Sequence, residues 1–101
     1  MLARHARADG RLGHHLRLDE AVVRRAAADL FEAEQNNNRA EELIRNQLIS
    51  KQQLDEAATR YKGARAAHEE ALLQVEQFKA QLQSSEAARD LAEKKLKDAS
   101  I

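Results

Sequence analysis

The sequence lacks most of the residues that build a compact globular core. It contains no cysteine, proline or tryptophan, and its three aromatic residues are Phe31, Tyr61 and Phe78. Without cysteine, the chain carries no mark of a redox compartment. Its 101 residues form one domain at most. What remains for a core is a thin seam of alanine and leucine, which can join two helices but cannot enclose a ligand cavity.

An excess of charge of one sign is missing as well. The chain has 17 basic and 17 acidic side chains, although residues 1–17 hold four arginines against one aspartate. This mild asymmetry is far from the charge of a nucleic-acid-binding protein, so we expect no nucleic-acid partner. No apolar run is long enough for a secretory signal or a membrane span. We therefore expect a soluble chain with no signal or anchor of its own.

The residues that are abundant favour helix. From residue 20 onward the chain consists mainly of Ala, Glu, Gln, Lys, Arg and Leu, and 34% of all residues are charged. Alanine is the strongest helix former because it loses no side-chain entropy. This composition with helical periodicity is typical of coiled coils and long helices. The sequence therefore predicts an all-α protein.

The first half of the chain divides into a weak and a strong helical segment. Gly10 and Gly13 each cost a helix about 1 kcal/mol relative to alanine, so we expect residues 1–18 to be frayed or partly helical. Asp19 is suited to cap the start of a helix over residues 19–47. The apolar positions of this helix alternate by three and four, which is a heptad seam with one polar member: Val23, Ala26, Leu30, Ala33, Asn37, Ala40, Ile44 and Leu48.

The chain then turns and starts a second helix. Ser50-Lys51-Gln52-Gln53 is a capping-box sequence, in which the serine hydroxyl accepts from the backbone N–H three residues later and the glutamine side chain reaches back. Ile49 and Leu54 have the spacing of a hydrophobic staple. These signals predict a turn over residues 48–50 and a helix over residues 51–98. Its seam comprises Leu54, Ala57, Tyr61, Ala64, His68, Ala71, Val75, Phe78 and Leu82, and continues less regularly through Ala88, Leu91 and Leu96.

A connection this short makes two long helices antiparallel neighbours. We therefore predict an antiparallel two-helix coiled-coil hairpin over residues 19–101. Folding about residue 48 places these pairs opposite each other: Ile44 with Leu54, Asn37 with Tyr61, Leu30 with His68, Val23 with Val75, and Leu18 with Phe78. Asn37 then fixes the register and pairs with Tyr61. The second helix is the longer one, so its last third lacks a partner unless residues 1–18 supply one weakly, through Leu2, Ala6, Leu12 and Leu16.

Residues 39–58 resemble the hairpin tip of a known protein family. The stretch reads Arg-Ala-Glu-Glu-Leu-Ile-Arg-Asn-Gln-Leu-Ile-Ser-Lys-Gln-Gln-Leu-Asp-Glu-Ala-Ala. Its Arg39, Leu43 and Ser50 have the spacing found at the tip of many periplasmic adaptors, or membrane fusion proteins, of the AcrA/HlyD type. The closing stretch, residues 91–101, resembles the end of the second hairpin helix in that family.

The resemblance implies an α-hairpin of an adaptor that links an inner-membrane pump to an outer-membrane channel in tripartite efflux or secretion. Docking by the tip would use Arg39 as a forked donor, Leu43 as an apolar anchor and Ser50 as a helix cap. Neighbouring adaptor protomers are further partners, and the pump contacts domains absent from this sequence. The family acts in the periplasm, associated with the inner membrane. Because its lipoyl-like and β-barrel domains are missing here, we expect the chain to be a fragment.

Each tip residue also has a plain structural interpretation. Ser50 caps a helix in either case, Arg39 alone is a solvated surface arginine, and Leu43 alone packs beside Ile44. The alternative function is therefore a generic structural coiled coil, a scaffold or tether that self-associates.

No pattern in the sequence indicates catalysis, so we predict that the chain is not an enzyme. It has no glycine-rich phosphate loop and no nucleophile–base pair. His68 falls on the seam, and His14 and His15 follow His5, but no ligand spacing supports a metal site among them. We expect no metal and no cofactor. The arginines of residues 1–17 come without aromatic platforms, which favours a solvated tail over a surface for nucleic acid or lipid.

Overall fold

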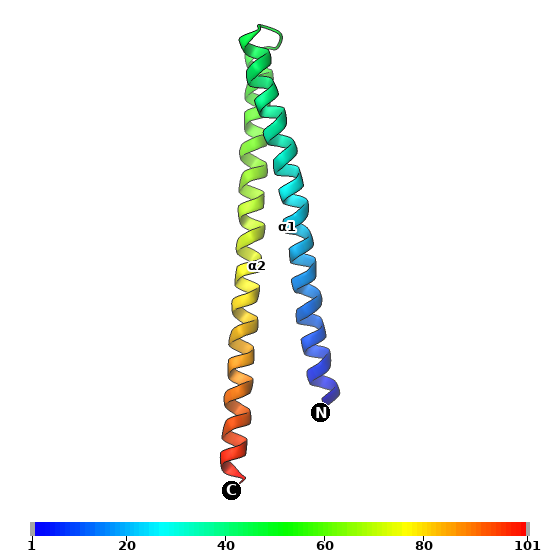
Figure 1. Cartoon of the computed structure of the whole chain (residues 1–101), viewed down its shortest axis with the longest axis vertical. Helices are drawn as coiled ribbons and strands as arrows, with labels where there is room; N and C mark the ends of the chain where they lie inside the picture. The colour runs from blue at the N-terminus through cyan, green and yellow to red at the C-terminus, as the bar shows by residue number, and fades with distance from the viewer. Residues whose placement is uncertain (1, 101) are drawn as a thin grey trace.

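The chain forms a hairpin of two long helices. The structure is a computed structural model that describes the backbone of residues 2–100 and the side chains of residues 15–100. Helix α1 spans Leu2–Arg45 and helix α2 spans Lys51–Ala99. The chain reverses direction between them, so the helices are antiparallel and the two chain ends lie opposite the turn (Figure 1). The molecule measures 81 × 20 × 14 Å. The predicted all-α hairpin is confirmed.

The two predicted seams hold the helices together. Every position predicted for the first seam from Val23 to Ile44 is buried or half-buried, and so is every position of the second from Leu54 to Leu82. The most deeply buried side chains are small ones, namely Ala40, Ala71 and Val75. Small side chains allow the two backbones to approach closely, but each buries little apolar area. The hairpin therefore has a continuous core that is only one layer deep.

Leu48 does not belong to the seam, so its assignment there was wrong. Its side chain is 68% exposed. The physical reason is the end of α1 at Arg45, two residues earlier than predicted. Leu48 therefore lies in the connection between the helices, where the heptad spacing no longer directs side chains toward α2.

Helix α1 has no break at residue 19, so the predicted cap at Asp19 was wrong. The helix begins at Leu2 and continues through Gly10 and Gly13. An N-cap residue needs a non-helical backbone, whereas Asp19 lies inside the helix and is half-buried beside α2. The costly step in forming a helix is its first turn. Once α1 has formed, the alanines, leucines and arginines around the two glycines extend it toward Leu2. Leu2, Ala6 and Leu12, suggested as partners for α2, have side chains outside the described part.

At the open end, Phe78 lies at the level of His15 and Asp19 on α1. Its ring contacts the ring of His15, with centroids 5.9 Å apart and planes tilted by 44°, and it lines a shallow groove together with Asp19. Leu18 is 49% exposed, whereas Leu16 and Asp19 are half-buried. Leu18 points to the flank of the seam because residues 16 and 19 occupy the three-residue step that faces α2. Phe78 therefore lies within about one turn of the predicted level on α1, with His15 as its ring partner.

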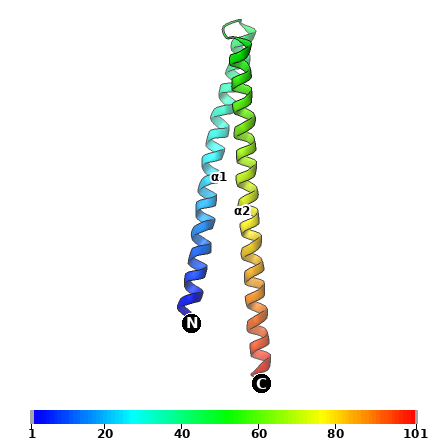
Figure 2. The ribbon, with the colours of Figure 1, turned by 180° about the vertical axis from the view of Figure 1, so that it is seen from behind.

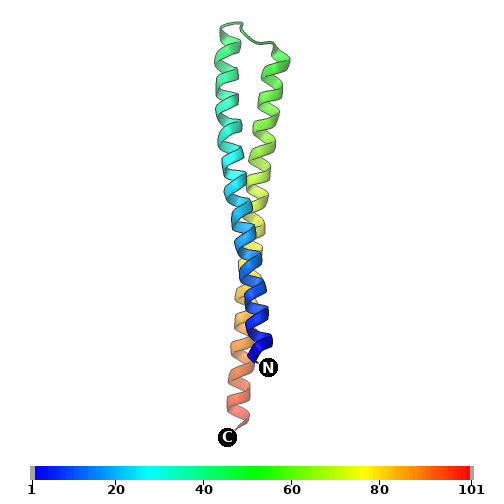
Figure 3. The same ribbon diagram turned by 90° about the vertical axis from the view of Figure 1, so that its right-hand side faces the viewer.

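The helices wind about each other along the molecule. Near the turn they stand side by side in Figure 3, whereas near the chain ends they stand apart in Figure 1 and in the reverse view of Figure 2. The plane that contains both helices therefore rotates along the long axis, as expected for a coiled coil. Toward the chain ends, α1 covers less of α2, and residues 90–100 are all exposed. The tip is thus the closed end of the hairpin.

The hairpin tip as candidate functional site

Helix α1 ends in a Schellman motif that turns the chain. The backbone N–H of Gln47 donates to the carbonyl of Ile44 at 3.0 Å, and the N–H of Leu48 donates to the carbonyl of Leu43 at 2.9 Å. These are the two hydrogen bonds that define the motif. Gln47 has a φ of 59°, the left-handed conformation that the motif requires and that glycine adopts most readily. Backbone hydrogen bonds therefore define the end of α1, and the helix does not fray there.

Helix α2 begins with the predicted capping box. Ser50 has an extended backbone, with φ −80° and ψ 160°, as an N-cap residue requires. The backbone N–H of Gln53 donates to Ser50 Oγ at 3.1 Å, and the backbone N–H of Ser50 donates to Gln53 Oε1 at 2.9 Å. Both reciprocal hydrogen bonds are present, so the assignment of Ser50 as N-cap is confirmed.

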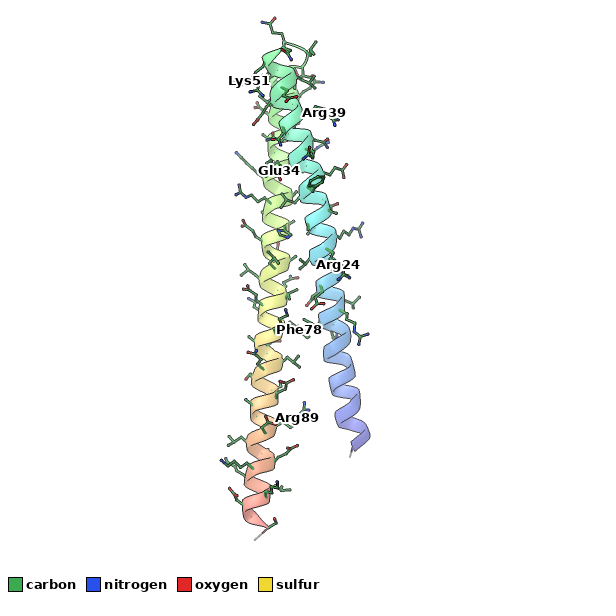
Figure 4. All side chains as sticks on the ribbon, viewed as in Figure 1. Arg24, Glu34, Arg39, Lys51, Phe78 and Arg89 are labelled. Carbon is green, nitrogen blue, oxygen red and sulfur yellow. The ribbon has the colours of Figure 1, made fainter. Side chains whose placement is uncertain are left out.

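The three residues singled out by the sequence all lie in the closed end. Arg39 and Leu43 are one helical turn apart on α1, and Ser50 stands at the start of α2. Arg39 is exposed, Leu43 is half-buried and Ser50 is exposed. Figure 4 shows the side chains of Arg39 and Lys51 close to the turn. The fold therefore brings a cation, part of an apolar side chain and a capping hydroxyl to one end of the rod.

Gln47 is a turn residue that the sequence did not indicate, and Leu48, expected in the turn over residues 48–50, was not singled out as a docking residue. The usual signal for a Schellman motif is glycine at the left-handed position, and here that position is glutamine. A weaker signal was present, because a leucine at position 43 followed by another at position 48 matches the hydrophobic pair that accompanies the motif. The heptad spacing instead assigned Leu48 to the seam.

The predicted partnership of Asn37 with Tyr61 is only half right. Both side chains line one shallow groove along the seam, together with Glu41, Leu54, Asp55, Ala58, Lys62 and Arg65. However, Asn37 Oδ1 is buried and has no hydrogen-bond partner among the described residues. The two residues are neighbours, but Tyr61 does not satisfy that oxygen. An unpaired buried carbonyl is costly, so Asn37 lowers the stability of the seam at this level.

The described part of the chain shows neither a metal cluster nor a membrane-spanning segment. Among residues 15–100, whose side chains are described, no three histidine, aspartate or glutamate side chains are placed to hold one ion. Neither α1 nor α2, as far as they are described, has a stretch that is both long and apolar enough to cross a bilayer. Comparison with protein-family models, curated proteins and solved structures finds no match for this chain.

Proposed function

We propose that this chain is the α-hairpin of a periplasmic adaptor, which links an inner-membrane pump to an outer-membrane channel in tripartite efflux or secretion and docks by its tip. The observation that carries the proposal is the position of Arg39, Leu43 and Ser50. Their spacing resembles that of an adaptor tip, and all three fall at the closed end of an antiparallel hairpin. The same spacing in the middle of a long helix would not support docking.

The chemistry of the three residues suits contact with the ends of other helices. The exposed guanidinium of Arg39 offers a planar set of donors for carboxylates or backbone carbonyls. Leu43 adds apolar surface beside it. The Ser50 hydroxyl already accepts from Gln53, and it lies 3.4 Å from Gln53 Oε1, which is long for an O–H donor. Its proton therefore remains available to an acceptor on a partner.

Under this proposal the hairpin works in the periplasm, beside neighbouring adaptor protomers. The tip supplies the contact with the channel, and the contact with the pump belongs to domains outside this sequence. The length of the rod then serves as a spacer that holds the two membrane components apart.

A structural coiled coil that self-associates is the second candidate. The observation that favours it is the apolar surface left on α2 beyond the covered seam. Two leucines beyond the seam, Leu91 and Leu96, are 54% and 77% exposed. Contact with another chain on this stretch would cover part of that apolar surface. This candidate predicts a stable dimer, whereas the adaptor proposal predicts binding at the tip.

A direct binding measurement tests the adaptor proposal. The chain has no cysteine, so Ala99→Cys provides a unique point for immobilisation at the end opposite the tip. Binding of the purified outer-membrane channel of the same organism is then compared for the parent chain, Arg39→Asp and Arg24→Asp. Both arginines are exposed residues of α1, but Arg24 lies far from the turn (Figure 4). We expect Arg39→Asp to weaken binding by about tenfold or more, and Arg24→Asp to leave it unchanged.

Ser50→Asp separates docking from folding at the serine. Aspartate is as good an N-cap as serine, so the helix content measured by circular dichroism should be retained. We expect channel binding to fall, because the new carboxylate cannot donate to an acceptor on the partner. Equal binding by the parent chain and by both Arg39→Asp and Ser50→Asp would refute a docking role for the tip.

A further inference from the structure

The apex of the hairpin, defined as residues 43–54, carries charge of one sign in a chain whose formal net charge is zero. Its charged side chains are Arg45 and Lys51, both exposed. The acidic residues nearest to the apex lie just below it on the two helices, at Glu41, Glu42, Asp55 and Glu56. The end of the rod therefore presents two cations and no carboxylate of its own.

Leu48 adds an apolar side chain at the middle of this end. It follows Gln47 in the Schellman motif, and its backbone is held by the hydrogen bond to the Leu43 carbonyl. In such a motif the side chain after the left-handed residue often packs back on the helix. Here Leu48 stays 68% exposed, whereas its neighbour Ile49 is half-buried. The turn thus displays a leucine on a fixed backbone instead of hiding it.

Other exposed leucines have different surroundings. Leu73, which is 56% exposed, lies on the shaft of α2 with Glu69, Glu70 and Glu76 along the same helix. Leu48 instead lies between Arg45 and Lys51, three residues away on either side. Only the apex therefore combines an exposed leucine on a rigid turn with flanking cations, among the residues whose side chains are described.

We propose that the apex inserts Leu48 into an apolar recess whose rim carries carboxylates that face Arg45 and Lys51. The inference rests on the proposed function and deepens it, because it states the chemistry that the outer-membrane channel must present to the tip. A fixed leucine loses little conformational freedom when it is buried by a partner, which favours binding. The two cations attract the acidic rim and orient the approach. Arg39, one turn below the apex, then contacts the outside of the same partner.

The test uses the immobilised chain and the purified channel described above. Leu48→Ala is compared with Leu73→Ala, which removes the same atoms from an exposed leucine of the shaft. The double change Arg45→Gln with Lys51→Gln is compared with Arg24→Gln with Arg25→Gln, a matched pair of exposed arginines on α1. Helix content is followed for every variant by circular dichroism, so that loss of folding is recognised separately from loss of binding.

We expect Leu48→Ala to weaken binding by about tenfold or more, and Leu73→Ala to change it by less than about twofold. The double apex change should weaken binding by a similar factor at low salt and by less at high salt, because added salt screens charges at exposed surfaces. The matched arginine pair should show neither effect.

Three results would overturn the inference. If Arg39→Asp abolishes binding but Leu48→Ala does not weaken it, the recess is refuted while the adaptor function stands. If Leu48 matters but the double apex change has no effect at any salt concentration, the acidic rim is refuted. If the channel does not bind the parent chain at all, the inference and the proposed function fail together.

Discussion

At the scale of single residues, the turn depends on Gln47 and Ser50. Gln47 has a φ of 59°, and a side chain in this region costs roughly 1–2 kcal/mol through contact of Cβ with the next carbonyl. Glycine avoids that cost but gains freedom in the unfolded chain. We therefore expect Gln47→Gly to raise the free energy of unfolding by about 0.5–1 kcal/mol. Thermal unfolding followed by circular dichroism measures the difference.

Gln77→Gly is the matched control for Gln47→Gly. Gln77 lies in the interior of α2 and is exposed, so glycine there should destabilise by about 1 kcal/mol. Both substitutions replace glutamine by glycine, but the expected changes in the free energy of unfolding have opposite signs. A loss of stability in both would mean that Gln47 does not have the left-handed conformation.

Ser50 makes a second contribution that can be measured at the residue scale. Ser50→Ala removes the acceptor for the Gln53 N–H, and loss of an N-cap typically costs about 1 kcal/mol. Ser50→Thr keeps a hydroxyl and should lower the free energy of unfolding by no more than about 0.3 kcal/mol. Chemical denaturation of the three proteins, compared at equal concentration, checks the order. If alanine and threonine were equally destabilising, the hydroxyl would not be the group that stabilises the start of α2.

At the scale of elements, the helices derive their stability from length and composition more than from a deep core. Within α2, Gly63 is the residue that departs from this helix-favouring composition. A Cβ built at this position meets no atom within 4 Å, and helical glycine is about 1 kcal/mol less favourable than alanine. We expect Gly63→Ala to stabilise the hairpin by about that amount, which corresponds to a rise in melting temperature of roughly 4–8 °C for a chain of this size. Ala66→Gly, at an exposed position of the same helix, should lower the melting temperature by a similar amount. No change in either variant would mean that α2 is not helical around residue 63.

The elements differ in how well the sequence predicts them. The start of α2 is encoded locally by Ser50 and Gln53, and the seam from Leu54 to Leu82 repeats without interruption, so periodicity and capping were sufficient. The start of α1 was mispredicted at Asp19. Its side chain is suited to capping whether or not the residues before it are helical, so the local sequence does not decide where the helix begins. Leu48 was expected in the turn and was also counted as the last seam position, because the left-handed position before it carries no glycine signal. The function of the tip was predicted from a resemblance and stays a proposal.

At the scale of the whole molecule, every functional statement depends on the reversal of the chain at residues 46–50. The proposed docking surface exists only if Arg45 and Lys51 stand at the same end of the rod. A continuous helix through these residues would place them in the middle of a shaft, where Leu48 would face another chain in a coiled coil. The closed hairpin and the extended dimer are therefore distinct molecules with the same sequence and the same helix content.

Small-angle X-ray scattering combined with light scattering distinguishes them most directly. The hairpin predicts a monomer of 11.4 kDa with a longest dimension near 81 Å and a Cα radius of gyration of 22.8 Å. A dimer with a longest dimension of about 150 Å, the length of a continuous helix of this chain at 1.5 Å per residue, would contradict the hairpin and with it the tip.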